Sequence, residues 1–201
     1  YTSINADFKT ETTVNIPSYG TLVPSINASR KMKNGNLIKA AYNRRISRPS
    51  LRFLDPNIEA SNPLQISQGN PTLDPELTDN YEVGYSTFIK GTVINFTSFY
   101  RNTTGSIQSV RTIQDDGVIF TTFENIGREQ AVGGSVFFNI NASNKLSFNG
   151  GFDTYYAILD NGLSDPLLAA QNEGFVISGR MFGNYTLPKN WQLQLFTFAR
   201  G

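Results

Sequence analysis

The sequence predicts an all-β protein of antiparallel strands, and three observations lead to this class. Period-two alternation of apolar and polar residues recurs along the chain, whereas helical periodicity is almost absent. Short and long connections between these segments alternate strictly along the chain. The 201 residues are 12% aromatic but only 16% charged, against about 25% charged in an average soluble domain. Together these features are typical of an antiparallel transmembrane β-barrel, which turns tightly at one end and carries long loops at the other.

The alternation places apolar side chains on one face of each expected strand. The interleaved residues are mostly Asn, Gln, Ser, Thr and Gly. Such a polar face needs water, because each buried polar group without a partner costs about 1 to 3 kcal/mol; a water-filled or plugged lumen supplies it. We expect about eight strands of this kind. The apolar faces of seven of them carry Ile38, Ala40, Tyr42 and Ile46; Tyr81, Val83, Tyr85 and Ile89; Ile94, Phe96 and Tyr100; Val136, Phe138 and Ile140; Leu146, Phe148 and Phe152; Phe175, Ile177, Met181, Tyr185 and Leu187; and Trp191, Leu193 and Leu195.

Turn residues fix where the strands reverse. Gly, Pro or Asn, which tight turns need, stands in each of the short segments 33–36, 90–91, 142–144 and 188–190. Long loops are expected at 47–79, 105–128 and 157–174. Trp191 follows a turn, and Phe88 and Tyr185 precede turns, positions that suit an aromatic girdle at a membrane interface.

Composition excludes several classes of function. Histidine and cysteine are absent, which removes thiol nucleophiles, imidazole bases and the usual zinc sites. Lys and Arg number 17 against 16 Asp and Glu, so no basic surface for nucleic acid is indicated. We expect no enzyme activity, no catalytic residues and no cofactor.

The segment SQGNPTLDPELTDNYEVGY, residues 67–85, concentrates turn residues before one strand. Gly69 can take a positive φ, and Pro71 fixes its own φ and restricts Asn70. Asp74, Pro75 and Glu76 suggest the start of a single helical turn. The segment then directs the following strand, although a turn-rich linker in a soluble sandwich would show a similar pattern.

These residues also carry a resemblance to a known family. The segment around RRISRP, the loop GNPTLDPE and the strand start NYE resemble the barrel region of TonB-dependent receptors, in particular the outer-membrane β-barrel family abundant in Bacteroidetes. The segments 22–29 and 124–136 are similar to that family too. The motif residues are Arg44, Arg45, Ile46, Ser47, Arg48 and Pro49; Gly69, Asn70, Pro71, Leu73, Pro75 and Glu76; and Asn80, Tyr81 and Glu82.

The resemblance implies a location and partners. It implies that residues 1–201 are part of one barrel domain in the bacterial outer membrane, with about 22 strands in the whole barrel. A plug domain and a segment that engages TonB would belong to the rest of the receptor, since no plug is visible in this fragment. The implied partners are outer-membrane lipid, the plug and TonB system, and a nutrient ligand whose identity and binding residues the sequence leaves open.

Two groups of residues are candidate sites. Asp115-Asp116-Gly117, and Asp160-Asn161-Gly162 with Asp165, offer oxygen atoms for calcium, but their spacing is not that of an EF-hand and we expect plain turns and no metal. Arg44, Arg45, Arg48 and Arg52 could bind an anion. Because successive strand residues point to opposite faces, Arg44 and Arg45 cannot both face the lumen.

Three functions remain open on the sequence alone. The first is the wall and extracellular loops of a TonB-dependent receptor that imports a large or scarce nutrient, such as an iron chelate, a vitamin or a glycan. The second is a passive porin or a structural or adhesive outer-membrane barrel. The third is a soluble, secreted β-sandwich that binds carbohydrate or protein.

Overall fold

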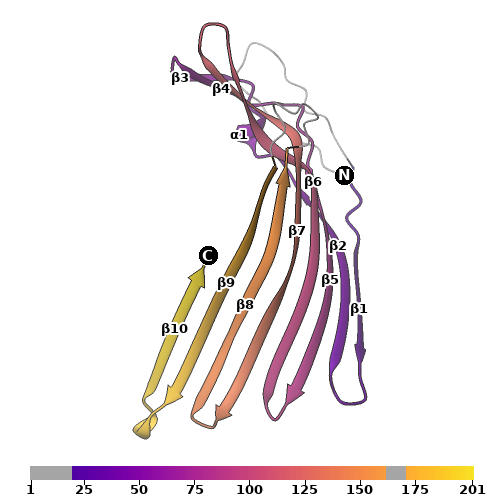
Figure 1. Cartoon of the computed structure of the whole chain (residues 1–201), viewed down its shortest axis with the longest axis vertical. Coiled ribbons are helices and arrows are strands. Elements are labelled where there is room, and N and C mark those ends of the chain that lie inside the picture. Colours follow the sequence, from indigo (N-terminus) through magenta and orange to yellow (C-terminus); the bar gives the residue numbers. More distant parts are fainter. Residues whose placement is uncertain (1–19, 162–170) are drawn as a thin grey trace.

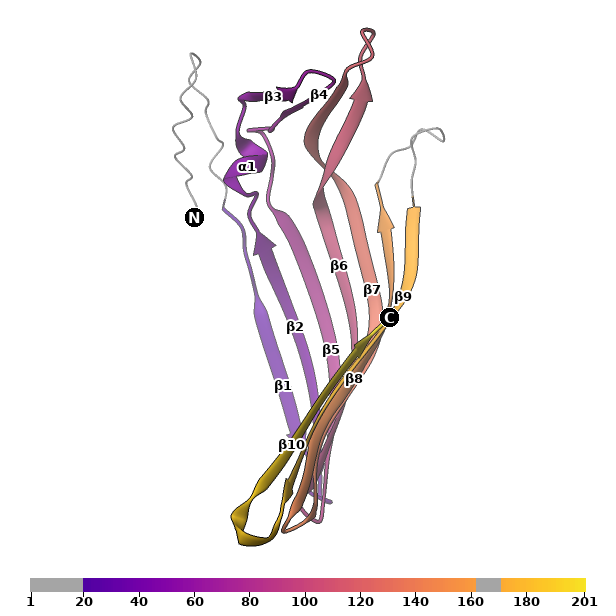
Figure 2. The ribbon, with the colours of Figure 1, turned by 90° about the vertical axis from the view of Figure 1, so that its left-hand side faces the viewer.

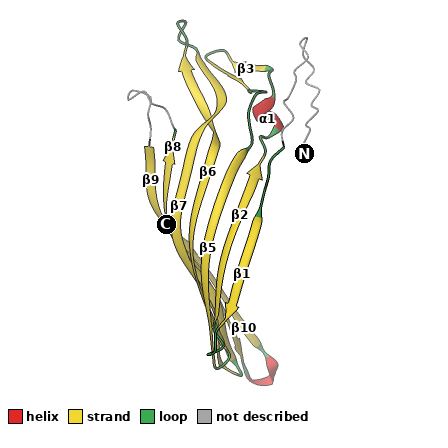
Figure 3. Cartoon of the chain, turned by 90° about the vertical axis from the view of Figure 1, so that its right-hand side faces the viewer, coloured by secondary structure: helices red, strands yellow, loops and turns green. Residues whose placement is uncertain are grey.

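A computed structural model describes residues 20–161 and 171–201, and within them it is almost entirely β-structure (Figure 1). Figure 3 shows the helical residues as two short pieces at opposite ends of the molecule. The elements are β1 Ser25–Lys31, β2 Leu37–Ser47, α1 Leu51–Leu54, β3 Ile58–Asn62, β4 Gln65–Gln68, β5 Glu76–Ile89, β6 Thr92–Ile113, β7 Ile119–Ser143, β8 Leu146–Asp160, β9 Gln171–Thr186, the 3₁₀ turn η1 Pro188–Asn190, and β10 Gln192–Arg200.

Eight strands form one continuous antiparallel sheet in the order β1-β2-β5-β6-β7-β8-β9-β10. This confirms the predicted fold class and the expected number of wall strands. Within the described residues β1 and β10 are the two edges, so the sheet is not closed. The edge strands run at clearly different angles in Figure 2, as in a twisted and curved sheet. A total of about 22 strands stays a prediction.

Short turns and long connections lie at opposite ends of this sheet, as predicted. The turns at 32–36, 90–91, 144–145 and 187–191 lie together at the lower end of Figure 1, whereas α1, β3 and β4 lie at the upper end. In outer-membrane barrels the short turns face the periplasm and the long loops face the exterior. By the same pattern we expect the upper end of Figure 1 to be the extracellular end, and we use that name for it below.

The prediction of long loops at 105–128 and 157–174 was wrong in extent. β6 continues to Ile113 and β7 begins at Ile119, so both strands stay paired beyond the wall as one long hairpin. β8 likewise reaches Asp160 and β9 starts at Gln171, while residues 162–170 lie outside the described part of the chain. Segment 106–113, with Ile, Val and Thr, has the β-branched residues that favour strands.

Gly105 marks the point where the hairpin leaves the wall. Its φ is +66°, and the pairing of β6 with β7 shifts register between Thr104, Ser106 and Ile107. A glycine with positive φ at such a shift is typical of a β-bulge, which bends a strand without ending it. The bulge allows pairing to continue where the sequence suggested a loop.

The register confirms the predicted apolar and polar faces. Tyr42, Tyr81 and Tyr100 are paired across β2, β5 and β6, with ring centroids 4.9 Å and 6.2 Å apart. Val83 on the same face is 60% exposed. Among the described residues only Leu54, Leu73 and Ala131 are buried hydrophobic residues, so the apolar face of the wall is left uncovered and available to lipid.

Candidate functional site

The long connections at the extracellular end fold together around a small apolar core. Leu54 of α1 and Leu73 are 1% and 3% exposed, and Phe53, Ile107 and Phe123 pack against them. The Phe53 and Phe123 ring centroids lie 4.5 Å apart. The connection between β2 and β5 is thereby fixed onto the hairpin formed by β6 and β7.

Gly69 lets the two arms of this connection approach closely. Its N–H donates to the carbonyl of Asp55 at 2.8 Å, and an added Cβ would lie 2.5 Å from the same oxygen and 2.7 Å from the Phe53 carbonyl oxygen. Its φ is not positive, which corrects the expectation from the sequence. The glycine is needed because backbone atoms occupy the space of a side chain.

Asn70 joins the same connection to the hairpin. Its N–H donates to the Phe53 carbonyl at 2.6 Å, and its Nδ2 donates to the Phe123 carbonyl at 3.0 Å. Its Oδ1 accepts from the N–H of Thr72 at 3.0 Å. One side chain therefore holds its own turn and the neighbouring strand.

The expected helical turn at Asp74, Pro75 and Glu76 is not formed, because β5 begins at Glu76. The backbone of Asp74 is engaged by Asn125, whose Oδ1 accepts from the Asp74 N–H and whose Nδ2 donates to the Asp74 carbonyl, both at 2.8 Å. The Glu76 carboxylate accepts from the N–H of Ile107 at 2.9 Å. Both contacts join this segment to other strands, whereas a helix cap would have bonded to residues next to it in the sequence. The sequence pattern gives Asn125 no particular role, although it lies in segment 124–136, which is similar to the family.

The other motif residues do not gather in one place. Arg45 and Arg48 are exposed and Pro49 is buried just before α1. Tyr81 stacks on the apolar face, whereas the neighbouring Glu82 accepts a hydrogen bond from Asn80 Nδ2 at 2.6 Å on the polar face. Pro71 and Pro75 flank Leu73 in the loop.

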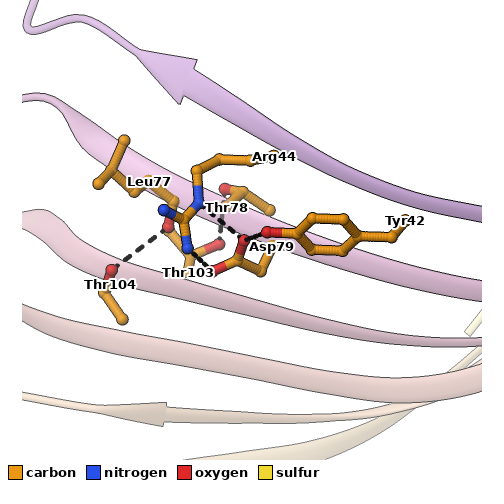
Figure 4. Close-up of polar contacts among 7 residues, drawn as sticks. All are labelled: Tyr42, Arg44, Leu77, Thr78, Asp79, Thr103 and Thr104. Atoms are coloured by element: carbon orange, nitrogen blue, oxygen red, sulfur yellow. Dashed lines mark hydrogen bonds and ion pairs between the residues drawn. The ribbon is translucent and has the colours of Figure 1, made fainter. Parts of the chain in front are cut away.

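Arg44 belongs to the apolar face, opposite in direction to Arg45. Figure 4 shows its guanidinium against Asp79 of β5, with Nε to Oδ1 at 2.8 Å and Nη2 to Oδ2 at 2.9 Å. The Tyr42 hydroxyl donates to the same carboxylate at 2.7 Å. Arg44 is thus paired with Asp79. Of the four arginines predicted as an anion site, Arg52 is the one that lines a cavity.

That cavity, of about 850 Å³, lies at the extracellular end between the β3–β4 hairpin and the β6–β7 hairpin. β4 pairs in parallel with the start of β7 and closes one side. The lining is mainly polar, and Ile58 on it is 60% exposed, so the space is open to solvent. Arg52 of α1, Arg111 of β6, Asp55, Glu59, Gln65 and Gln68 supply its charged and amide groups.

Arg52 and Arg111 have no ion pair or hydrogen bond within the described residues. Asp55 Oδ1, in contrast, accepts from the N–H and Nδ2 of Asn57 at 3.0 and 2.8 Å. Two free guanidinium groups in a solvent-open space of ligand size can bind carboxylate, phosphate or other oxygen-rich groups. Sequence reasoning missed Arg111, because it lies 59 residues from Arg52 in an expected loop.

Of the two calcium candidates, Asp115-Asp116-Gly117 lies wholly within the described residues. No group of three or more His, Cys, Asp or Glu side chains suits a metal ion there. Asp116 Oδ1 accepts from the Val118 N–H at 3.0 Å, as in a plain hairpin turn. Of the second calcium candidate, Gly162 and Asp165 lie outside the described residues. No helix among those described is long and apolar enough to cross a membrane.

A single antiparallel sheet with an uncovered apolar face, short turns at one end and folded loops at the other defines the class as an outer-membrane β-barrel wall. The chain belongs to the outer membrane protein beta-barrel family, whose model matches residues 1–201. It is therefore a protein of the bacterial outer membrane. A search among curated proteins gave no match.

Solved structures show the same fold. The siderophore receptor PirA from Pseudomonas aeruginosa is similar with a TM-score of 0.57 and 16% identity, over 88% of this chain and 41% of that one. A single-residue mutant of the ferric enterobactin receptor PfeA from the same organism, in complex with enterobactin, has a TM-score of 0.56 and 18% identity, over 87% of this chain and 34% of that one. The chain thus spans less than half the length of these receptors.

Proposed function

We propose that the chain forms part of the barrel wall and the extracellular loops of a TonB-dependent receptor that imports a large or scarce nutrient, such as an iron chelate, a vitamin or a glycan. The observation that carries the proposal is the 850 Å³ cavity at the extracellular end of an outer-membrane wall. Its free arginines and amides suit a ligand rich in oxygen atoms. The fold shared with two siderophore receptors supports an import role.

In the proposed mechanism the loops of this chain contribute to ligand capture, and the wall supplies one side of the import path. On the polar face Asn43 of β2 pairs with Asn80 of β5, and Glu82 lies two residues further along β5 on the same face. These polar side chains suit a wet or plugged lumen. A plug domain and the TonB system would act through the rest of the receptor. No catalytic step is proposed, and the family and its solved neighbours are outer-membrane proteins and receptors rather than enzymes.

The alternatives differ in structure and in energy requirement. A soluble sandwich buries its apolar faces between two sheets, whereas this sheet has one layer with an uncovered apolar face. A passive porin or an adhesive barrel would have the same wall. Only a dependence of uptake on TonB distinguishes a receptor from these alternatives.

The test uses the full-length gene in its native cell. A deletion strain is grown on media that each limit one nutrient: chelated iron, cobalamin or a defined glycan. We expect a growth defect on one of them that the full gene restores only when TonB is present. Restored growth without TonB would favour the porin.

A double variant then tests the cavity. Arg52→Gln with Arg111→Gln should lower the uptake rate at limiting nutrient at least ten-fold, which corresponds to the loss of about 1.4 kcal/mol of binding. Arg30→Gln, on β1 and far from the cavity, removes the same kind of charge as a control. Equal uptake by both variants would exclude this cavity as the capture site.

A further inference from the structure

Each of the four short turns of the wall carries one lysine. Lys33, Lys90, Lys145 and Lys189 stand in the turns 32–36, 90–91, 144–145 and 187–191. All four are exposed. No ion pair or hydrogen bond of their ammonium groups is found in the described part of the chain. We call these four residues the basic rim.

The rim holds one sign of charge only. None of the four turns contains Asp or Glu. The nearest acidic residues on β5 and β8, Glu82 and Asp153, each lie eight residues along the strand from the lysine of the adjoining turn. That separation is about 26 Å of strand, beyond the Debye length of about 8 Å at physiological salt. The extracellular end, in contrast, mixes both signs.

The backbone at two of the turns indicates that the lysines are there for their side chains. Lys90 has φ of +47° and Lys189 has φ of +62°. This left-handed region favours Gly and Asn and is uncommon for other residues. Local conformation alone would therefore favour Asn or Gly at these positions, so the lysines are explained better by their charge than by the turn.

The rim lies where the apolar face of the wall ends. Trp191, two residues after Lys189, is 71% exposed, and Ile89 of the apolar face, directly before Lys90, is 58% exposed. Exposed aromatic side chains beside lysines are characteristic of the level at which hydrocarbon gives way to lipid headgroups. Because the short turns face the periplasm, these headgroups belong to the inner leaflet of the outer membrane.

We propose that the basic rim binds anionic phospholipid headgroups of the periplasmic leaflet. The complementarity is that of unpaired ammonium groups with the phosphodiester of a lipid that has net negative charge, such as phosphatidylglycerol. Each lysine near an anionic lipid surface should favour anionic over neutral lipid about five-fold. The rim thereby fixes the height of the wall in the membrane, independently of any nutrient.

The experiment uses the full-length receptor, purified in mixed micelles of phosphatidylcholine and phosphatidylglycerol. Native mass spectrometry measures the ratio of the two lipids that stay bound. We expect the wild-type receptor to prefer phosphatidylglycerol in roughly 0.1 M salt, the range in which surface charges act, and to lose the preference in high salt. Lys90→Asn with Lys189→Asn should lower it about five-fold for each lysine replaced.

Matched variants separate charge from folding. Asn is favoured in the left-handed region, so the double variant keeps its turns and should fold as well as the wild type. Lys90→Arg with Lys189→Arg keeps the charge and should keep the preference. Lys39→Asn, on the polar face of β2, should leave it unchanged. A folded Asn double variant with wild-type preference would overturn the proposal.

A second result would also overturn it. If the wild-type receptor binds both lipids equally but binds an acidic soluble protein through the same lysines, the rim is a protein-docking surface. Neither outcome depends on nutrient uptake, so the proposed import function is tested separately.

Discussion

The side-chain amide of Asn125 is hydrogen-bonded in both directions to the backbone of Asp74, which lies 51 residues earlier in the chain. Nδ2 also donates to the Gly105 carbonyl at 2.8 Å. One amide thus joins β7, the segment just before β5 and the bulge in β6. These three points hold the extracellular loops, and with them the cavity, in a fixed relation to the wall.

Asn125→Ala should loosen these loops without unfolding the wall. The change leaves the Asp74 N–H and two carbonyls without protein partners, at a cost of about 2 kcal/mol in local stability. Hydrogen exchange in the full-length receptor should become roughly thirty-fold faster in α1 and the β3–β4 hairpin. Asn57→Ala is the control, because Asn57 bonds only to Asp55 within its own turn. Unchanged exchange in the Asn125 variant would show that the apolar core alone fixes the loops.

Gly69→Ala should destabilise the same loop for a steric reason. The added methyl group would meet backbone atoms of Asp55 and Phe53 at 2.5 to 2.7 Å, and backbone cannot move aside as a flexible side chain can. Such overpacking costs about 1 to 3 kcal/mol. Limited proteolysis of whole cells should then cut the 47–75 connection faster than in the wild type. Gly174→Ala is the matched control, since an added Cβ there would have no atom within 4 Å and the φ of Gly174 is not positive; equal cleavage in both variants would contradict the steric argument.

Much of the wall is predictable from sequence because its determinants are local. The alternation that places Tyr42 and Tyr81 on one face is a property of each strand by itself. The turn at Lys90 and Gly91 is likewise marked by residue type. The length of the β6–β7 hairpin was missed, because the bulge at Gly105 keeps the two strands paired beyond the wall.

The candidate site was harder to predict because it depends on contacts between distant segments. In the sequence Asn125 looks like an ordinary loop residue and Asp74 like the start of a helical turn, and only the fold brings the two together. The sequence marks Gly69 by its conformational freedom, but the structure shows that the glycine is needed because backbone atoms of Asp55 and Phe53 lie close to it. Arg52 is a candidate from the sequence, but only the structure places Arg111 on the same cavity.

Cysteine probes test the assignment of the two faces. Ile94 lies on the apolar face and its neighbour Asn95 on the polar face, where Asn95 Oδ1 accepts from the Ser86 hydroxyl. In the full-length receptor in detergent, Ile94→Cys should be shielded from a charged thiol reagent, whereas Asn95→Cys should react. The chain has no other cysteine in residues 1–201, so any native cysteine elsewhere in the receptor is first replaced. The opposite pattern would mean a register one residue out, which would reverse both faces.

Epitope insertion tests which end of the sheet faces the exterior. Gly117, at the tip of the β6–β7 hairpin, and Gly91, in a short turn, form a matched pair: both have φ of +81°, and neither has an atom within 4 Å of an added Cβ. A tag after Gly117 should bind antibody on intact cells, because the hairpin extends beyond the wall on the long-loop side. A tag after Gly91 should bind only after the outer membrane is permeabilised. Immunoblots of both proteins after heat treatment control for folding. Labelling of the Gly91 tag on intact cells would place the short turns outside, and would move the basic rim from the periplasmic leaflet to the cell surface.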